Sequence, residues 1–152
     1  MTERAVLLMT IVAFPAICAA APVQLTRGPG DDTEAAWSPD GSMVAFQREA
    51  GGDVDLCVLD VESGRVTTLV GGAGHALHPY WSPDGETIVY AFAHFTHTAA
   101  QGIEDGYNLF AVPADGGEPT RLTEGLCRDY TPTFAPAGDA ILFSSTRGLE
   151  NA

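Results

Sequence analysis

The stretch Trp37-Ser38-Pro39-Asp40-Gly41 decides the fold, because it returns as Trp81-Ser82-Pro83-Asp84-Gly85 and, in altered form, as Phe134-Ala135-Pro136-Ala137-Gly138. In the first two copies proline presets the first position of a tight turn, aspartate suits the second, and glycine adopts the left-handed conformation that lets the chain reverse. Each copy therefore predicts a hairpin turn. The three copies together predict a chain built from repeats of one small β unit.

Four strands can be assigned to a complete repeat from the alternation of apolar and polar residues. We expect the first strand over residues 35–38, 79–82 and 131–135, and the second over residues 43–46, 87–90 and 140–143. We expect the third over residues 54–61 and 107–114, and the fourth over residues 66–70 and 120–123. Residues 23–26 match a fourth strand, because Leu25 lies 12 residues before the next aromatic landmark, as Leu69 and Leu122 do.

Repeats of more than forty residues with four antiparallel strands are typical of β-propeller blades. The sequence therefore predicts an all-β fold, an incomplete β-propeller with two full blades at about residues 35–70 and 78–123, a half blade at 131–147 and the isolated N-terminal strand. The aromatic residues Trp37, Trp81 and Phe134 recur in register, which predicts packing between blades. Because propellers generally close with roughly four to eight blades, we expect a truncated gene or incomplete reading frame, whose unpaired strand edges favour self-association.

The first 20 residues have the pattern of a secretory signal peptide. A short polar start with Arg4 is followed by an apolar run over residues 5–14, by Pro15 and by small residues. This run is too short to span a bilayer comfortably. We expect cleavage after Ala20, which leaves residues 21–152 as the propeller part of a periplasmic or secreted protein with no further membrane insertion.

The composition of the mature chain bounds its partners and its cysteine chemistry. The sequence has 20 acidic and 7 basic residues, and residues 1–20 remove one of each, which leaves 19 and 6 and a net charge of -13. Such a surface repels phosphate backbones and anionic lipids, so we expect no nucleic-acid partner. Cys57 and Cys127 lie two blades apart in the predicted fold, so we expect both thiols to be unpaired.

The second repeat and its flanks carry a family resemblance. The pattern Pro-x-Trp-Ser-Pro-Asp-Gly-x-x-Ile-x-Tyr over residues 79–90, followed by Asn108-Leu109-Phe110 and by residues 117–123, resembles the TolB-like propeller repeat. That family includes the periplasmic TolB protein of the Tol-Pal envelope system and the N-terminal propellers of prolyl-oligopeptidase-type peptidases. The resemblance covers residues 22–147. It implies the fold, while the function has to be argued from a site.

The histidines are the most suggestive chemical feature of the sequence. His75 and His78 lie between the fourth strand of one repeat and the first strand of the next, and His94 and His97 lie in a loop between second and third strands. Both kinds of loop leave the blade on the same face, because successive strands alternate in direction. Imidazole suits zinc, copper, nickel or manganese, so the four histidines are either ligands of a transition metal or polar residues at the mouth of the channel.

Two carboxylates belong to the same predicted face. Asp32 and Asp129 each lie five residues before the aromatic residue of their repeat. They either add oxygen ligands to the histidine cluster or solvate the rim of the propeller. Apart from this transition metal, we expect no cofactor.

The sequence thus favours an exported, non-catalytic propeller module, here a fragment, which binds an envelope or extracellular protein or polymer on its loop-bearing face. The alternative is the propeller portion of an enzyme. One version is a serine peptidase that lacks its hydrolase domain, since no Gly-x-Ser-x-Gly nucleophile elbow occurs in the chain. The other is a metal-dependent polysaccharide lyase, because propeller relatives that act on pectin fragments hold metal ligands on a histidine-bearing face.

Overall fold

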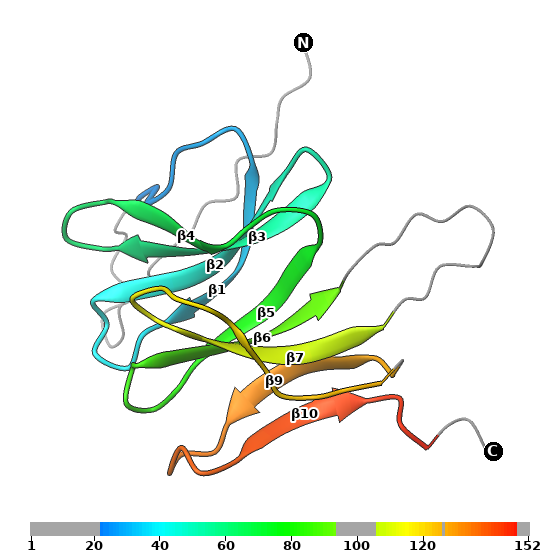
Figure 1. Cartoon of the computed structure of the whole chain (residues 1–152). Coiled ribbons are helices and arrows are strands. Elements are labelled where there is room, and N and C mark those ends of the chain that lie inside the picture. Colours follow the sequence, from blue (N-terminus) through cyan, green and yellow to red (C-terminus); the bar gives the residue numbers. More distant parts are fainter. Residues whose placement is uncertain (1–21, 94–105, 126, 149–152) are drawn as a thin grey trace.

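The computed structural model describes residues 22–93, 106–125 and 127–148 (Figure 1). The predicted signal peptide over residues 1–20 and the candidate ligands His94 and His97 therefore lie outside the described residues. Within these ranges the chain forms ten strands: β1 (Asp31–Trp37), β2 (Met43–Ala50), β3 (Asp53–Asp60), β4 (Val66–Val70), β5 (His75–Trp81), β6 (Thr87–Ala93), β7 (Tyr107–Pro113), β8 (Thr120–Arg121), β9 (Asp129–Phe134) and β10 (Ile141–Ser145).

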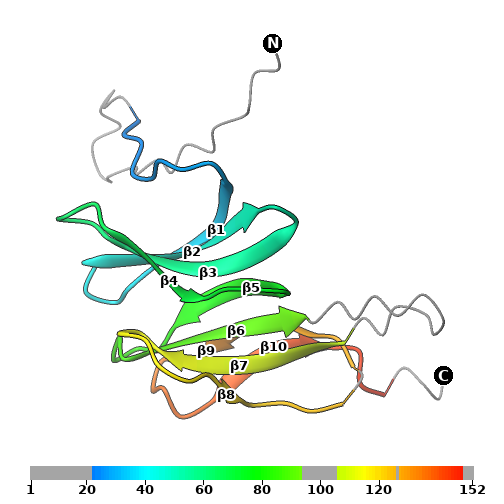
Figure 2. The ribbon, with the colours of Figure 1, turned by 45° about the horizontal axis from the view of Figure 1, so that its top comes forward.

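The strands form three successive antiparallel units, which we name blade 1 (β1–β4), blade 2 (β5–β8) and blade 3 (β9 and β10). In each unit every strand pairs antiparallel with the next along the chain. Blades 1 and 2 are joined by a single parallel bridge, at which the Val54 amide donates to the Gly74 carbonyl at 3.1 Å. Figure 2 shows blade 1 lying over blade 2, and Figure 1 shows blade 3 below blade 2. The predicted all-β propeller architecture is confirmed.

One predicted strand is not formed. Residues 23–26 are described but have no regular secondary structure. A fourth strand pairs with the third strand of its blade; β3 and β7 are already paired with β4 and β8, and blade 3 has no third strand among the described residues. The segment instead contributes a side chain to packing, because Leu25 lies against the buried cluster of blade 1 that contains Phe46 and Leu59. The prediction of an N-terminal strand was therefore wrong for the described chain.

The Ser-Pro-Asp-Gly turns close the hairpins as the sequence predicts. The Gly41 amide donates to the Ser38 carbonyl at 2.9 Å, and Gly41 has a φ of 73°, which favours glycine. The Ser38 hydroxyl donates to Asp40 Oδ1 at 2.7 Å and accepts from the Met43 amide at 2.9 Å. Blade 3 keeps the equivalent backbone bonds, from Gly138 to Ala135 and from Ala135 to Ala140, although its turn lacks the serine and aspartate side chains. The backbone bonds and the glycine therefore suffice to form the turn.

Burial between blades 1 and 2 forms the main core. The buried cluster takes residues from both units, including Ala45 and Leu56 from blade 1 and Ile88 and Tyr90 from blade 2. Trp81 also belongs to this cluster, and its indole Nε1 donates to the Ala36 carbonyl of blade 1 at 3.0 Å. Each blade thus stabilises the next by covering the apolar face of its sheet.

The two tryptophans at equivalent positions differ in exposure. Trp81 is 4% exposed, whereas Trp37 is 46% exposed. Both end the first strand of their blade and precede the same turn. The difference arises because Trp81 packs on the preceding blade, and no blade among the described residues lies before β1. Packing between blades is therefore confirmed for Trp81 and does not extend to Trp37.

This contrast predicts unequal effects of the same substitution. Trp81→Ala should lower the free energy of unfolding by about 3–5 kcal/mol, because it leaves a cavity between two blades. Trp37→Ala should lower it by less than about 1 kcal/mol. If Trp81→Ala prevents folding, Trp81→Phe should still cost about 1 kcal/mol through the lost hydrogen bond, and Trp37→Phe should cost almost nothing. Urea unfolding of the full chain measures all four, and equal losses at the two positions would contradict this assignment.

Candidate functional site

The predicted rim carboxylates Asp32 and Asp129 are buried and lie in internal ion pairs. Asp32 is 7% exposed, and its two oxygens accept from Arg48 Nε at 2.7 Å and Nη2 at 2.9 Å. Asp129 is fully buried and accepts from the Ser145 hydroxyl at 2.6 Å and from Arg147. In the described structure both carboxylates serve to hold the first two strands of a blade together.

A similar arrangement occurs in blades 1 and 3, with an aromatic ring beneath each arginine, although Ser145 and not Arg147 occupies the position of Arg48. The Arg48 guanidinium lies 5.2 Å from the centroid of Phe46, and that of Arg147 lies 6.0 Å from the centroid of Phe143. These are distances at which cation–π attraction operates. The network therefore belongs to the repeat, and its aspartates hold the blade together.

Blade 2 replaces the ion pair with an apolar pair. Ala76 and Phe92 lie opposite each other on β5 and β6, at the positions that Asp32 and Arg48 occupy on β1 and β2. The Phe92 ring packs edge-on against Tyr90, with centroids 6.3 Å apart. The repeat thus accepts either a complete ion pair or a complete apolar pair at this place.

His75 and His78 contact protein oxygen atoms. His75 Nε2 lies 3.0 Å from the Gly52 carbonyl oxygen, which can only accept, so this nitrogen carries the proton. His78 Nδ1 lies 3.4 Å from Glu34 Oε2 of blade 1. Among the described residues no group of three or more histidine, cysteine, aspartate or glutamate side chains could hold a metal ion. The predicted four-histidine cluster stays a prediction, since its other half lies outside the described residues.

A backbone feature links His78 to the residues at the same position of the other two blades. Glu34, His78 and Thr131 occupy the same position of successive blades, and their φ values are 52°, 55° and 52°. The pairing register shifts around all three, between Thr33 and Ala36, between Leu77 and Tyr80, and between Tyr130 and Thr133. Each first strand therefore carries a bulge with a left-handed residue, a strained conformation that costs on the order of 1–3 kcal/mol outside glycine.

A groove runs along the first strands of all three blades, and we name it the inner groove. It has a volume of about 730 Å³ and is lined by residues of β1, β5 and β9 and by the prolines of their turns. Tyr80 is 43% exposed there. The matching positions in blades 1 and 3 hold Ala36 and Thr133. An aromatic ring at this site is therefore not a requirement of the repeat.

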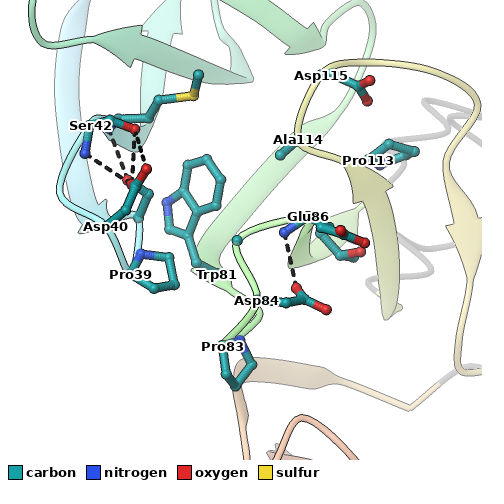
Figure 3. Close-up of a pocket in the computed structure, with 14 residues that line it drawn as sticks. Pro39, Asp40, Ser42, Trp81, Pro83, Asp84, Glu86, Pro113, Ala114 and Asp115 are labelled. Atoms are coloured by element: carbon teal, nitrogen blue, oxygen red, sulfur yellow. Dashed lines mark hydrogen bonds between the residues drawn. The ribbon is translucent and has the colours of Figure 1, made fainter.

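A second groove lies on the turn-bearing end of blades 1 and 2, and we name it the turn groove (Figure 3). Its volume is about 930 Å³, and its lining includes Asp40, Asp84, Glu86 and Asp115. Hydrogen bonds from Ser38 and Ser42 lower the pKa of Asp40 to about 2. Bonds from the Ser82 hydroxyl and the Glu86 amide likewise lower the pKa of Asp84. These two carboxylates are ionised at neutral pH.

The two described cysteines are free. Cys57 is fully buried in blade 1, and its Sγ lies 3.5 Å from the Thr68 hydroxyl. Burial raises the pKa of the Cys57 thiol, which favours the unreactive protonated form. The prediction of two unpaired thiols is confirmed, and Cys57 has a packing role.

The exchange of an ion pair for an apolar pair between blades leads to a prediction. Asp32→Ala alone should lower the free energy of unfolding by about 3 kcal/mol, because it strands the Arg48 guanidinium in a largely buried site. Asp32→Ala combined with Arg48→Phe copies blade 2 and should return stability to within about 1 kcal/mol of the parent. Denaturant unfolding of both variants provides the measurement. A double variant no more stable than the single variant would show that the two arrangements are not equivalent.

Comparisons with known proteins agree with this fold, although no family model matches the chain. TolB homologues of Chlorobium chlorochromatii and Chlorobium luteolum are 31% and 32% identical, over 74% and 82% of this chain and 23% and 26% of the relatives. The uncharacterized peptidase YuxL of Bacillus subtilis is 27% identical, over 81% of this chain and 23% of the relative. The chain thus spans about a quarter of the length of these curated relatives.

Solved structures give the same result. A candidate TolB of Agrobacterium tumefaciens superposes with a TM-score of 0.66 and 27% identity, over 82% of this chain and 41% of that one. TolB of Acinetobacter baumannii superposes with a TM-score of 0.65 and 18% identity, over 84% of this chain and 30% of that one, which is a likeness of fold. In the described residues no helix is long and apolar enough to cross a membrane. The described chain is a TolB-like β-propeller segment.

Proposed function

We propose that this chain is part of an exported, non-catalytic propeller module that binds an envelope protein through the inner groove. The signal-peptide pattern of residues 1–20 and the likeness to TolB homologues support a periplasmic location. A groove lined by the first strands of successive blades offers a partner a surface built on rigid elements. The observation that carries the proposal is the exposed Tyr80 side chain in this groove.

Tyr80 is the natural anchor for a protein partner. Tyrosine combines a large apolar ring with a hydroxyl, and it is enriched among the residues that dominate binding energy at interfaces. Its neighbours along the groove are Pro79, which is buried, and Trp81, which is fixed by its bond to Ala36. The ring is thus held on a stiff surface, which reduces the entropy lost when a partner binds.

The experiment compares two tyrosines of similar exposure. A photo-crosslinking amino acid at position 80 of the full-length protein, expressed in its own envelope, should give one dominant protein adduct, identified by mass spectrometry. With that partner purified, Tyr80→Ala should weaken binding at least tenfold. Tyr130→Ala should change it less than twofold, because Tyr130 is 37% exposed but does not line the groove. Equal effects of the two substitutions, or no adduct at position 80, would contradict the proposal.

The likeness to the peptidase YuxL favours a second function, the substrate-controlling propeller of a serine peptidase. In that case a hydrolase domain accompanies these repeats in the complete protein, and a fluorophosphonate probe should label a serine beyond residues 1–152. Labelling of such a serine would favour the peptidase function, and a lack of labelling would favour the binding module. The lyase alternative would need His75 and His78 on a metal; one nitrogen of each ring contacts Gly52 and Glu34, respectively, and metal-binding histidines commonly make such contacts through their second nitrogen.

A further inference from the structure

The turn groove differs in character from the inner groove. One wall carries Asp40 and Ser42 from the turn of blade 1, and the other carries Asp84, Glu86 and Asp115 from blade 2 (Figure 3). The Trp81 indole lies between the two walls. Because the Trp81 Nε1 bond to Ala36 fixes this ring, the groove is a preformed feature of the contact between blades.

The groove combines an apolar floor with a rim of one charge sign. Met43, Trp81 and Pro113 contribute apolar surface to its lining. The lining also holds four carboxylates, and no lysine, arginine or histidine is among the residues that form it. Asp40, Asp84, Glu86 and Asp115 are all exposed to solvent. Charges placed along a cleft of this kind concentrate counter-charged groups within it.

We propose that the turn groove docks a basic, extended segment of a partner protein. Arginine and lysine fit both parts of the groove, because their aliphatic stems cover apolar surface while the charged heads stay in water. An arginine head makes paired hydrogen bonds with a carboxylate, which gives the contact direction as well as charge attraction. The two grooves adjoin and share Pro39, Trp81 and Pro83 in their linings, but Tyr80 lines only the inner groove and the four carboxylates line only the turn groove, so variants at these residues test the two proposals separately.

The next groove along the repeat serves as an internal comparison. A cavity of about 590 Å³ lies at the equivalent place between blades 2 and 3. There Ala135 and Ala137 stand where blade 2 has Ser82 and Asp84, and Asp84 is the only acidic residue of the lining. Glu86 corresponds to Asp139 of blade 3, and the strand that would carry a counterpart of Asp115 is not among the described residues. Of these two grooves, the one between blades 1 and 2 holds more carboxylates, and these supply the charge that attracts a basic segment.

The test uses the full chain and a fluorescein-labelled peptide, Gly-Arg-Ala-Arg-Pro-Arg-Gly, in fluorescence anisotropy at physiological ionic strength. Glu86→Gln combined with Asp115→Asn should weaken binding at least fivefold. The matched control, Asp31→Asn combined with Glu49→Gln, also removes two negative charges. These two residues are exposed and lie at the opposite end of β1 and β2 from the turn. The control should weaken binding less than twofold.

The outcomes separate specific docking from general attraction to an acidic protein. Equal weakening by the two double variants would overturn the proposal, because the peptide would then respond only to net charge. Equal binding of a peptide with glutamine in place of each arginine would overturn it as well, since the groove would then take an apolar occupant. Far-ultraviolet circular dichroism verifies that each double variant is folded, and only exposed side chains are changed.

Discussion

The rest of the structure depends on one constraint, which is that each blade must be covered by another. The hydrogen bond from the Trp81 indole to the Ala36 carbonyl is formed where blade 2 covers blade 1. A small twisted sheet has two faces and cannot bury an apolar one alone. Here Ile88 and Tyr90 of blade 2 close against Ala45 and Leu56 of blade 1. The turns follow the same rule, because Gly85 lies against Pro39 and Gly138 lies against Pro83. The turn groove and the inner groove are both consequences of this stacking.

Positions at which the repeats disagree are the most informative about function. Packing explains residues that recur, such as the turn glycines and the arginine over phenylalanine in blades 1 and 3. It does not explain Tyr80, which stands where the other blades have alanine and threonine, nor Glu86 of the turn groove, which stands where blade 1 has Ser42. Within a repeat architecture the other blades act as built-in controls. The Tyr80 proposal rests on such a difference, whereas the turn-groove proposal rests on the number of carboxylates that the stacking of blades 1 and 2 brings together.

Much of the fold could be predicted from the turn motif, since proline, aspartate and glycine fix where a hairpin reverses. The second strands begin where expected, at Met43 and Thr87. The first strands start earlier than predicted, because a left-handed bulge at Glu34 and His78 breaks the alternation while pairing continues beyond it. A non-glycine residue in that conformation leaves no signal in the sequence. The residues of each turn thus determine where the chain reverses. The position of each bulge depends on how the first strand pairs with the second.

The candidate site was harder to predict. Asp32 and Asp129 were expected at the solvated rim, and their burial depends on arginines 16 and 18 residues away that reach back across a hairpin. An alignment of the repeats on Phe46 and Phe143 would not have revealed both partners, because it places Ser145 and not Arg147 at the position of Arg48. The grooves are even harder to predict from the sequence, because residues from different blades line them. Grouping Asp40 with Asp115 requires the stacking of the blades to be known.

The most direct measurement of the stacking is hydrogen exchange of the two indole Nε1 protons, followed by NMR on the folded chain. The Trp81 proton, bonded to the Ala36 carbonyl inside the core, should exchange only through global unfolding, orders of magnitude more slowly than the proton of the half-exposed Trp37. Comparably fast exchange of both protons would contradict the account, because blade 2 would then not be sealed against blade 1.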